Sequence, residues 1–243
     1  PNGDMSSWST KIMKTLAGTD LNVAYPNAAD AEGFWDSGNN GTTSGLCTED
    51  KDNSCAKLES ANAFITVASG NLFTGSFTME GLVGTAAFGQ KYTYTARPSA
   101  LKLRYSMEAL GKVDFGGEKL KEGDADVATV FVCIVDWKDR HNVLSGMSFD
   151  PTVTVPSGMW NPATMEGLDK NNEKVIAYGV YDITAKTDGF VDLTIPLNFY
   201  DVEAAAPQGN YTLVISCSCS KYGDYLNGCS DNVMYVDDFQ WVY

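Results

Sequence analysis

The sequence of 243 residues contains one histidine, His141, and no Cys-x-x-Cys pair. A single imidazole leaves little scope for nucleophilic or metal chemistry, and no Gly-x-Ser-x-Gly segment could hold a serine nucleophile beside it. The six cysteines also lack the spacing of a zinc ribbon or of a thioredoxin-type redox site. The sequence therefore disfavours serine hydrolase, zinc-ribbon and dithiol redox functions.

Long apolar runs and positive charge are scarce as well. No run approaches the about 20 residues of a membrane-spanning helix, and 17 Lys and Arg face 31 Asp and Glu, for a net charge of −14. Such a charge repels phosphate backbones and anionic lipid surfaces, so we expect neither nucleic acid nor a membrane surface as a partner. The short apolar runs predict that the chain does not span a membrane. The sequence starts at Pro1 without a charged and apolar leader, and we expect any export signal to have been removed.

Runs rich in β-branched and aromatic residues recur between turn signals from Ala61 onward, which is typical of strands. In several of them apolar and polar residues alternate, so that one strand face is wet, as in antiparallel sandwiches. No helical period is sustained. We predict an all-β jelly-roll sandwich with antiparallel strands, of galactose-binding or concanavalin-like architecture. The predicted strands cover residues 63–67, 72–77, 92–97, 101–110, 127–137, 175–183, 191–199, 211–217 and 233–242.

The predicted domain organisation is simple. Residues 1–24 are interpreted as a linker or a leading edge strand, and residues 25–243 as a single jelly-roll domain. The chain stops on Trp241, Val242 and Tyr243, which predicts that its last strand pairs within a sheet, because large apolar side chains would otherwise stand in water. Trp137 and Trp241, within strand-like runs, are predicted core residues.

Three segments resemble the putative carbohydrate metabolism domain family of Bacteroidetes surface lipoproteins. They are GNLFTGSF at 70–77, ARPSALK at 96–102, and the end of the chain with SCSKYGD at 218–224 and MYVDDF at 234–239. The sequence departs from the usual pattern at Cys217 and Cys219, where small polar residues are usual, and at residues 229–231. The resemblance implies a jelly roll exported to the cell surface, lipid-anchored at the outer membrane and linked to glycan use. It implies no known reaction.

A glycan is accordingly the expected ligand, with a neighbouring N-terminal domain or surface glycan-uptake proteins as possible partners. A pyranose ring packs its CH face on an aromatic ring, and its hydroxyls bind planar carboxylate, amide or guanidinium groups. Trp160 is a further aromatic in a loop-like segment, and core burial is the alternative for all such rings. The candidate binding residues are Trp35, Asn39, Arg97, Tyr105, Lys221, Tyr222, Asp224 and Tyr225.

Two other functions remain open. A glycoside hydrolase needs a pair of carboxyl groups, and the strand-borne acids are the candidates, although the Glu-x-Asp-x-x-Glu pattern of sandwich-fold glucanases is absent. A structural or adhesive surface subunit would expose unpaired edge strands instead. The candidate acids are Glu108, Asp136, Asp182, Asp192 and Asp238.

Calcium is the one cofactor that the sequence suggests. Asp237 and Asp238 resemble the acid pair of galactose-binding-like modules, and Glu32 or Asp30 could complete an oxygen-rich site. A solvated acid pair is the alternative.

The cysteines support two further expectations. Cys47 and Cys55 bracket a hydrophilic segment that a disulfide could close. Cys133 lies in an apolar run and is predicted to be a buried thiol.

Overall fold

The protein is an almost purely β structure, described here from a computed structural model that covers residues 1–243. It contains no α-helix, and the only helical element is the 3-10 turn η1 (Gly223–Tyr225). None of its helical structure is long or apolar enough to cross a bilayer. The prediction of an all-β, antiparallel sandwich is confirmed.

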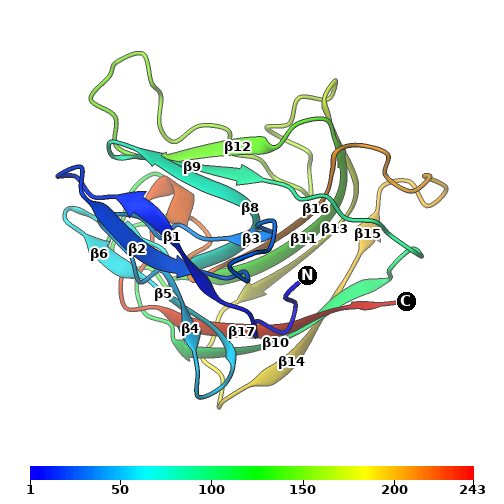
Figure 1. Cartoon of the computed structure of the whole chain (residues 1–243), viewed down its shortest axis with the longest axis horizontal. Coiled ribbons are helices and arrows are strands. Elements are labelled where there is room, and N and C mark those ends of the chain that lie inside the picture. The colour runs from blue at the N-terminus through cyan, green and yellow to red at the C-terminus, as the bar shows by residue number, and fades with distance from the viewer.

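Two antiparallel sheets form the body of the molecule (Figure 1). The C-terminal strand β17 lies between two partners in the smaller sheet, as its apolar sequence predicts. That sheet has the order β14 (Val191–Pro196), β10 (Ala100–Ala109), β17 (Val233–Val242), β5 (Cys55–Glu59) and β4 (Cys47–Asp50). The larger sheet has the order β12 (His141–Gly146), β9 (Val83–Phe88), β8 (Asn71–Glu80), β16 (Tyr211–Ser218), β11 (Ala128–Trp137), β13 (Glu173–Ile183) and β15 (Asn198–Phe199), with β3 (Trp35–Asp36) pairing with β8.

The core lies between the inner faces of the two sheets. Leu101 and Leu103 of β10 point into it from one side, and Val130 and Val132 of β11 from the other; all four side chains are buried. These positions are two apart along each strand, as the period of a strand requires. Each such side chain contributes about 1.5–3 kcal/mol of stability on burial.

The outer face of the larger sheet is also apolar, which a sandwich sheet bounded by water would not be. Phe73, Phe88, Cys133 and Trp137 form a second cluster there. The connection 147–172 folds over part of it and packs Trp160 against Trp137, with ring centroids 5.3 Å apart. The predictions that Cys133 and Trp137 are core residues are confirmed.

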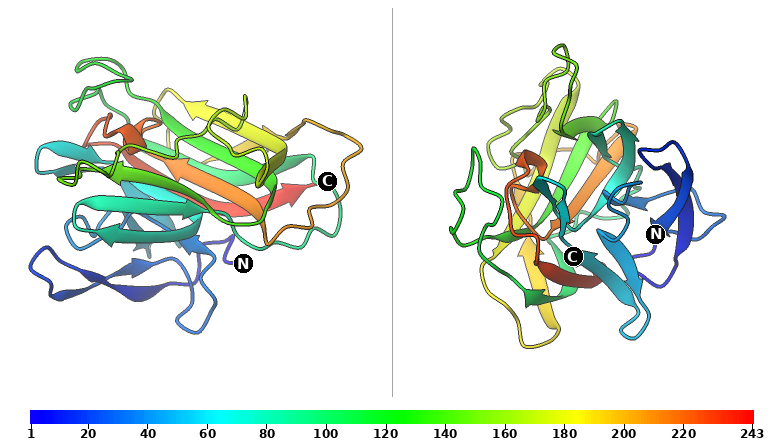
Figure 2. Two further views of the ribbon diagram at one scale, coloured as in Figure 1. Left: turned by 90° about the horizontal axis from the view of Figure 1, so that it is seen from above. Right: turned by 90° about the vertical axis from the view of Figure 1, so that its left-hand side faces the viewer.

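The N-terminal segment forms a hairpin of its own. Strands β1 (Ser9–Lys14) and β2 (Asp20–Tyr25) form a separate two-stranded hairpin, which lies at the periphery of the molecule (Figure 2). The segment is neither a linker nor an edge strand of the main sheets. Met5 is fully buried in the main core, and Lys11 forms an ion pair with the buried Asp36 at 2.6 Å.

Two predicted strands are also corrected. Residues 92–97 form no strand: the backbone N–H and oxygen of Tyr92 are both hydrogen-bonded to the Thr212 hydroxyl rather than to a neighbouring strand, and the rings of Tyr92 and Tyr94 pack against Trp241. Residues 63–67 contain the turn of a hairpin between β6 (Ala61–Ala63) and β7 (Thr66–Ala68). Strand β12 lies between residues 137 and 175, where the sequence predicts no strand.

All six cysteines are free and buried. No disulfide joins Cys47 and Cys55, because the hairpin of β4 and β5 pairs Cys47 with Leu58 and Cys55 with Asp50. The two thiols therefore lie on different rungs of the ladder. Burial raises the pKa of Cys133 well above the usual range of a thiol, and the pKa of Cys55 to about 12.

Candidate functional site

A groove of about 860 Å³, with both apolar and polar walls, lies over the outer face of the larger sheet. Its floor consists of outward-facing side chains of β8, β9, β11, β13 and β16, which alternate with the residues that fill the inter-sheet core. The floor residues include Phe77, Ala86, Phe131, Tyr178 and Ser218. Hydroxyl groups and aromatic rings thus line the same surface, as in many ligand sites.

The loop 219–226, which contains η1, forms an end wall of this groove. Lys221 Nζ lies 2.5 Å from Asp182 Oδ2 of β13, and Ser145 Oγ of β12 donates a hydrogen bond of 2.7 Å to the backbone oxygen of Asp224. Strands β12 and β13 lie toward opposite edges of the larger sheet. The loop therefore bridges both flanks of the sheet at one end, which fixes the position of the side chains that it carries.

Gly223 permits this placement of the loop. A Cβ atom at this position would lie 2.5 Å from Cβ of Ser69, which is closer than two non-bonded carbon atoms can approach. The backbone N–H of Ser220 also donates to Ser69 Oγ at 3.0 Å, so that the loop is held against the end of β7. Only glycine allows the two backbones to pass so closely.

Two tyrosines of this loop line the groove. The rings of Tyr222 and Tyr225 pack edge to face, with centroids 6.3 Å apart, and both are half-buried. Lys119 Nζ lies 4.4 Å from the ring centroid of Tyr225. Pairs of rings in this arrangement hold each other in one orientation, which leaves part of each ring surface available to a ligand.

Asp224 supplies the carboxyl group of the loop. Its side chain is exposed at the groove and accepts no hydrogen bond from the protein, yet the protein that surrounds this concave position desolvates it and raises its pKa to about 6. Because the Asp224 side chain also contacts solvent, its raised pKa changes the free energy of folding less than the same shift would in an enclosed carboxyl. Glu166, from the connection 147–172, is the second carboxylate of the lining and is also exposed.

His141 stabilises the opposite wall rather than facing the groove. Its Nε2 donates to the backbone oxygen of Gly158 at 2.5 Å, and its Nδ1 is hydrogen-bonded to Glu173. Gly158 precedes Met159 and Trp160, both of which line the groove. The single histidine therefore holds the connection 147–172 in place.

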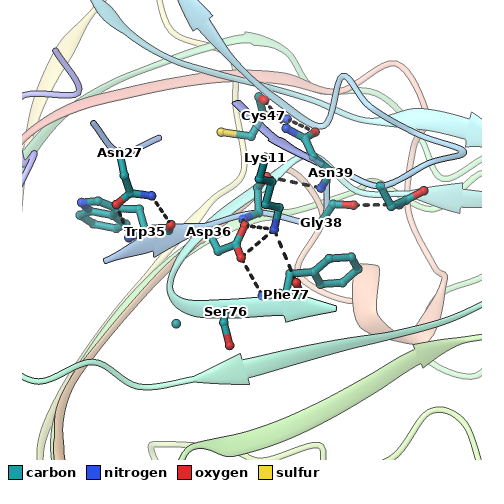
Figure 3. Close-up of polar contacts among 12 residues, drawn as sticks. Lys11, Asn27, Trp35, Asp36, Gly38, Asn39, Cys47, Ser76 and Phe77 are labelled. Atoms are coloured by element: carbon teal, nitrogen blue, oxygen red, sulfur yellow. Dashed lines mark hydrogen bonds and ion pairs between the residues drawn. The ribbon is translucent and has the colours of Figure 1, made fainter. Parts of the chain in front are cut away.

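Trp35 and Asn39 do not line the groove and lie among the buried contacts that Figure 3 shows. Trp35 is 1% exposed, and its ring packs against Phe239 at 4.9 Å. Asn39 is fully buried and clamps Cys47 by accepting its backbone N–H at 3.0 Å and donating to its oxygen at 2.6 Å. Residues 34–47 have few apolar side chains. Buried side-chain amides form the hydrogen bonds to backbone groups there that a neighbouring strand would form in a sheet.

Tyr105 and Arg97 lie outside the groove as well. Tyr105 is 6% exposed in the inter-sheet core, where burial and the neighbouring Tyr181 raise its pKa to about 12. Arg97 donates to the backbone oxygens of Val202 and Ala204, and its guanidinium lies 4.8 Å from the ring centroid of Phe199 in β15. β15 and η1 lie at opposite ends of the molecule (Figure 1), so Arg97 and the loop 219–226 are not brought together.

Three of the strand-borne acids are engaged with other groups of the protein. Asp136 accepts backbone N–H groups of the loop before β16, Asp192 pairs with Lys102 at 2.8 Å, and Asp182 pairs with Lys221. None of them is part of the groove lining. Glu166 lies there instead, in a segment whose polar sequence gave no sign of it.

The three acids of the predicted calcium site are not brought together either. Asp237 is buried and pairs with Arg104 at 2.7 Å, and the same guanidinium lies 3.8 Å from Asp238. Glu32 is exposed on another segment. No group of three or more His, Cys, Asp or Glu side chains is positioned to share a metal ion. A guanidinium between the two aspartates opposes a second cation at this place.

Sequence reasoning missed most of the groove floor. Phe77, Phe131 and Tyr178 lie at alternate positions of strands, where a period of two is equally compatible with a core face and a ligand-bearing face. The one sequence signal for these floor residues is that both faces of their strands are apolar. β11, for example, is buried almost continuously.

Two solved structures resemble the whole fold. A putative glycoside hydrolase from Bacteroides vulgatus ATCC 8482 has a TM-score of 0.60 at 20% identity, covering 96% of this chain and 95% of that one. A putative glycoside hydrolase from Bacteroides thetaiotaomicron VPI-5482 has a TM-score of 0.59 at 18% identity, covering 97% of this chain and 71% of that one. These similarities establish the fold, and no curated protein matches the chain. The family model of the putative carbohydrate metabolism domain matches residues 17–242, and the chain therefore belongs to this carbohydrate-related family.

Proposed function

We propose that the protein is a non-catalytic glycan-binding domain that holds a carbohydrate chain in the groove on the outer face of the larger sheet. The observation that carries the proposal is the loop 219–226, which presents Tyr222, Tyr225 and Asp224 together on one wall of a groove that also contains serine hydroxyls. Rings for CH faces and polar groups for hydroxyls are what a pyranose needs.

The charges of the groove favour a neutral glycan. Its two cations are already engaged, Lys119 with Glu118 at 2.9 Å and Lys221 with Asp182 at 2.5 Å. Its two carboxylates, Asp224 and Glu166, have no cationic partner. A uronic acid or a sulfated sugar would therefore meet repulsion without a compensating cation, in a chain whose net charge is −14.

The proposal is tested by affinity electrophoresis of the protein in gels that contain dextran, galactomannan, arabinoxylan or yeast mannan. Dextran sulfate and polygalacturonate are the anionic controls. Retardation by at least one neutral polysaccharide, and by neither control, is the expected result. No retardation by any neutral polysaccharide would contradict glycan binding.

A glycoside hydrolase is the second candidate, and Asp224 is the observation that favours it. A carboxyl whose pKa is raised to about 6 is suited to a general acid, and Glu166 offers a second carboxylate in the same groove. Release of reducing ends from the retained polysaccharide, abolished by Asp224→Asn, would establish hydrolysis. Binding without release supports the first proposal.

The family further suggests where the domain works. On this proposal it is an exported protein, lipid-anchored at the outer membrane, that captures glycan beside surface glycan-uptake proteins. Membrane fractionation of the native host with surface protease digestion tests the location, and recovery in the soluble cytoplasmic fraction would contradict it.

A further inference from the structure

The hairpin of β6 and β7 exposes two large apolar side chains at its tip. Phe64 and Ile65 are each 75% exposed, whereas Val67 near the base of the same hairpin is fully buried. Turns of this kind carry Gly, Asn, Asp or Ser in most proteins, since these residues suit both water and the backbone. The tip therefore carries apolar surface that the fold itself does not use.

The backbone at Phe64 makes this side chain more unusual. Ala63 pairs with Thr66, so Phe64 and Ile65 are the two central residues of a tight turn, and Phe64 has a φ of 63°. The first central position of such a turn favours glycine or asparagine, because a side chain there crowds the backbone. The backbone conformation at Phe64 thus disfavours a large side chain. This points to a role of the ring other than stabilising the fold.

The position of the ring identifies that use. Phe64 lines the groove, while Ile65 at the same tip does not. At the base of the hairpin, Ser69 Oγ lies 3.0 Å from Ser218 Oγ, which ties the hairpin to the groove floor. The loop that contains η1 contacts Ser69 at the end of the hairpin, and the two segments lie at the same end of the molecule (Figure 1). Phe64 therefore belongs to the same end of the groove as Tyr222 and Tyr225.

Resting on the proposed function, we infer that Phe64 is a ligand-contacting ring, which packs on the CH face of a neutral sugar at the end of the groove that Tyr222 and Tyr225 line. The occupant follows from the surroundings of the ring. The nearby charged groups of the groove offer no free cation to an anionic ligand. An aromatic face beside carboxylate and hydroxyl groups matches a pyranose, which is apolar on its face and polar on its rim.

The test compares three variants at the hairpin tip. Phe64→Gly removes the ring and relaxes the left-handed backbone, Phe64→Tyr keeps a ring, and Ile65→Ser removes an equally exposed apolar side chain that does not line the groove. Affinity for the neutral polysaccharide that retards the wild type is measured by isothermal titration, and thermal unfolding is followed for each protein.

We expect Phe64→Gly to weaken affinity about tenfold with a Tm no lower than that of the wild type. Phe64→Tyr and Ile65→Ser should bind as the wild type does. Unchanged affinity in Phe64→Gly would overturn the inference while leaving glycan binding itself intact. An equal loss in Ile65→Ser would also overturn it, because the tip would then act as a general apolar contact. If no neutral polysaccharide binds the wild type, the proposed function fails first.

Discussion

Lys221 Nζ lies 2.5 Å from Asp182 Oδ2, and this ion pair anchors the loop 219–226 to β13. Asp182 also accepts a hydrogen bond from Thr129 Oγ1 at 3.0 Å, which orients the carboxylate toward the loop. Lys221, expected from the sequence to contact a ligand, is thus engaged with the protein. It contributes to the groove by fixing the wall that carries Tyr222 and Tyr225.

A double-mutant cycle with Lys221→Met and Asp182→Asn should give a coupling of about 0.2–1 kcal/mol in the free energy of unfolding, the range of solvent-exposed ion pairs. The side chains are 36% and 37% exposed, so added salt should reduce the coupling. Chemical denaturation at low and high ionic strength measures it. Zero coupling at low salt would show that the pair does not hold the loop.

Tyr222→Ala should weaken glycan affinity by about 1–3 kcal/mol, because a sugar face loses its ring. Tyr243→Ala is the matched control, since Tyr243 is 63% exposed and lies outside the groove lining. Isothermal titration and thermal unfolding of both variants are compared with the wild type. A similar affinity in Tyr222→Ala and Tyr243→Ala would remove Tyr222 from the site.

Asp224 makes stability depend on pH in a defined direction. Its folded-state pKa is raised from the ordinary 3.8 to about 6, so the folded protein binds this proton more tightly than the unfolded chain does. The stabilising contribution of the protonated carboxyl is fully present below the ordinary pKa and is lost as the pH rises through about 6. Asp224→Asn should therefore raise Tm at pH 7 relative to the wild type and leave it unchanged at pH 3. An equal effect at both pH values would mean that desolvation does not act on this carboxyl.

A chelator should leave the melting temperature unchanged. Asp237 and Asp238 lie beside Arg104, and no third His, Cys, Asp or Glu side chain is placed to share a metal ion with them, so we expect no cation to bind the folded state there. Thermal unfolding with EDTA and with added calcium measures this. A lower Tm in EDTA that calcium restores would reinstate the sequence-based calcium prediction.

The main strands could be predicted because alternation along one strand reports directly on two faces. β10 and β14 were visible for this reason, with Leu101 and Ile195 facing the core. Residues 63–67 and 92–97 could not be resolved, since aromatic and β-branched residues are also common in turns and packed loops. The sequence therefore predicts a strand position for Phe64, whose ring is exposed at a turn.

The candidate site was partly predictable. A glycine between two tyrosines indicated a ring-bearing loop, and the structure places Tyr222, Asp224 and Tyr225 on the groove wall. Trp35 could not be distinguished from a ligand-binding tryptophan, because its polar neighbours suggested an exposed loop. Buried amides and the Lys11–Asp36 ion pair form that loop instead. Such networks depend on contacts between distant segments, which local sequence does not reveal.

The central claim, that the glycan lies in the groove, is best tested by reversible blocking of the groove. Val180 lines it and is 40% exposed, whereas Val191 is 37% exposed and lies outside it. All six native thiols are buried, so a bulky mixed disulfide should form only at a cysteine introduced by Val180→Cys or Val191→Cys.

Glycan affinity is then measured by isothermal titration before modification, after it, and after removal of the group by a reductant. We predict that modified Val180→Cys loses binding by more than about tenfold, that reduction restores it, and that Val191→Cys binds equally well in every state. Modified Val180→Cys that binds as tightly as the unmodified protein would contradict a groove-bound glycan.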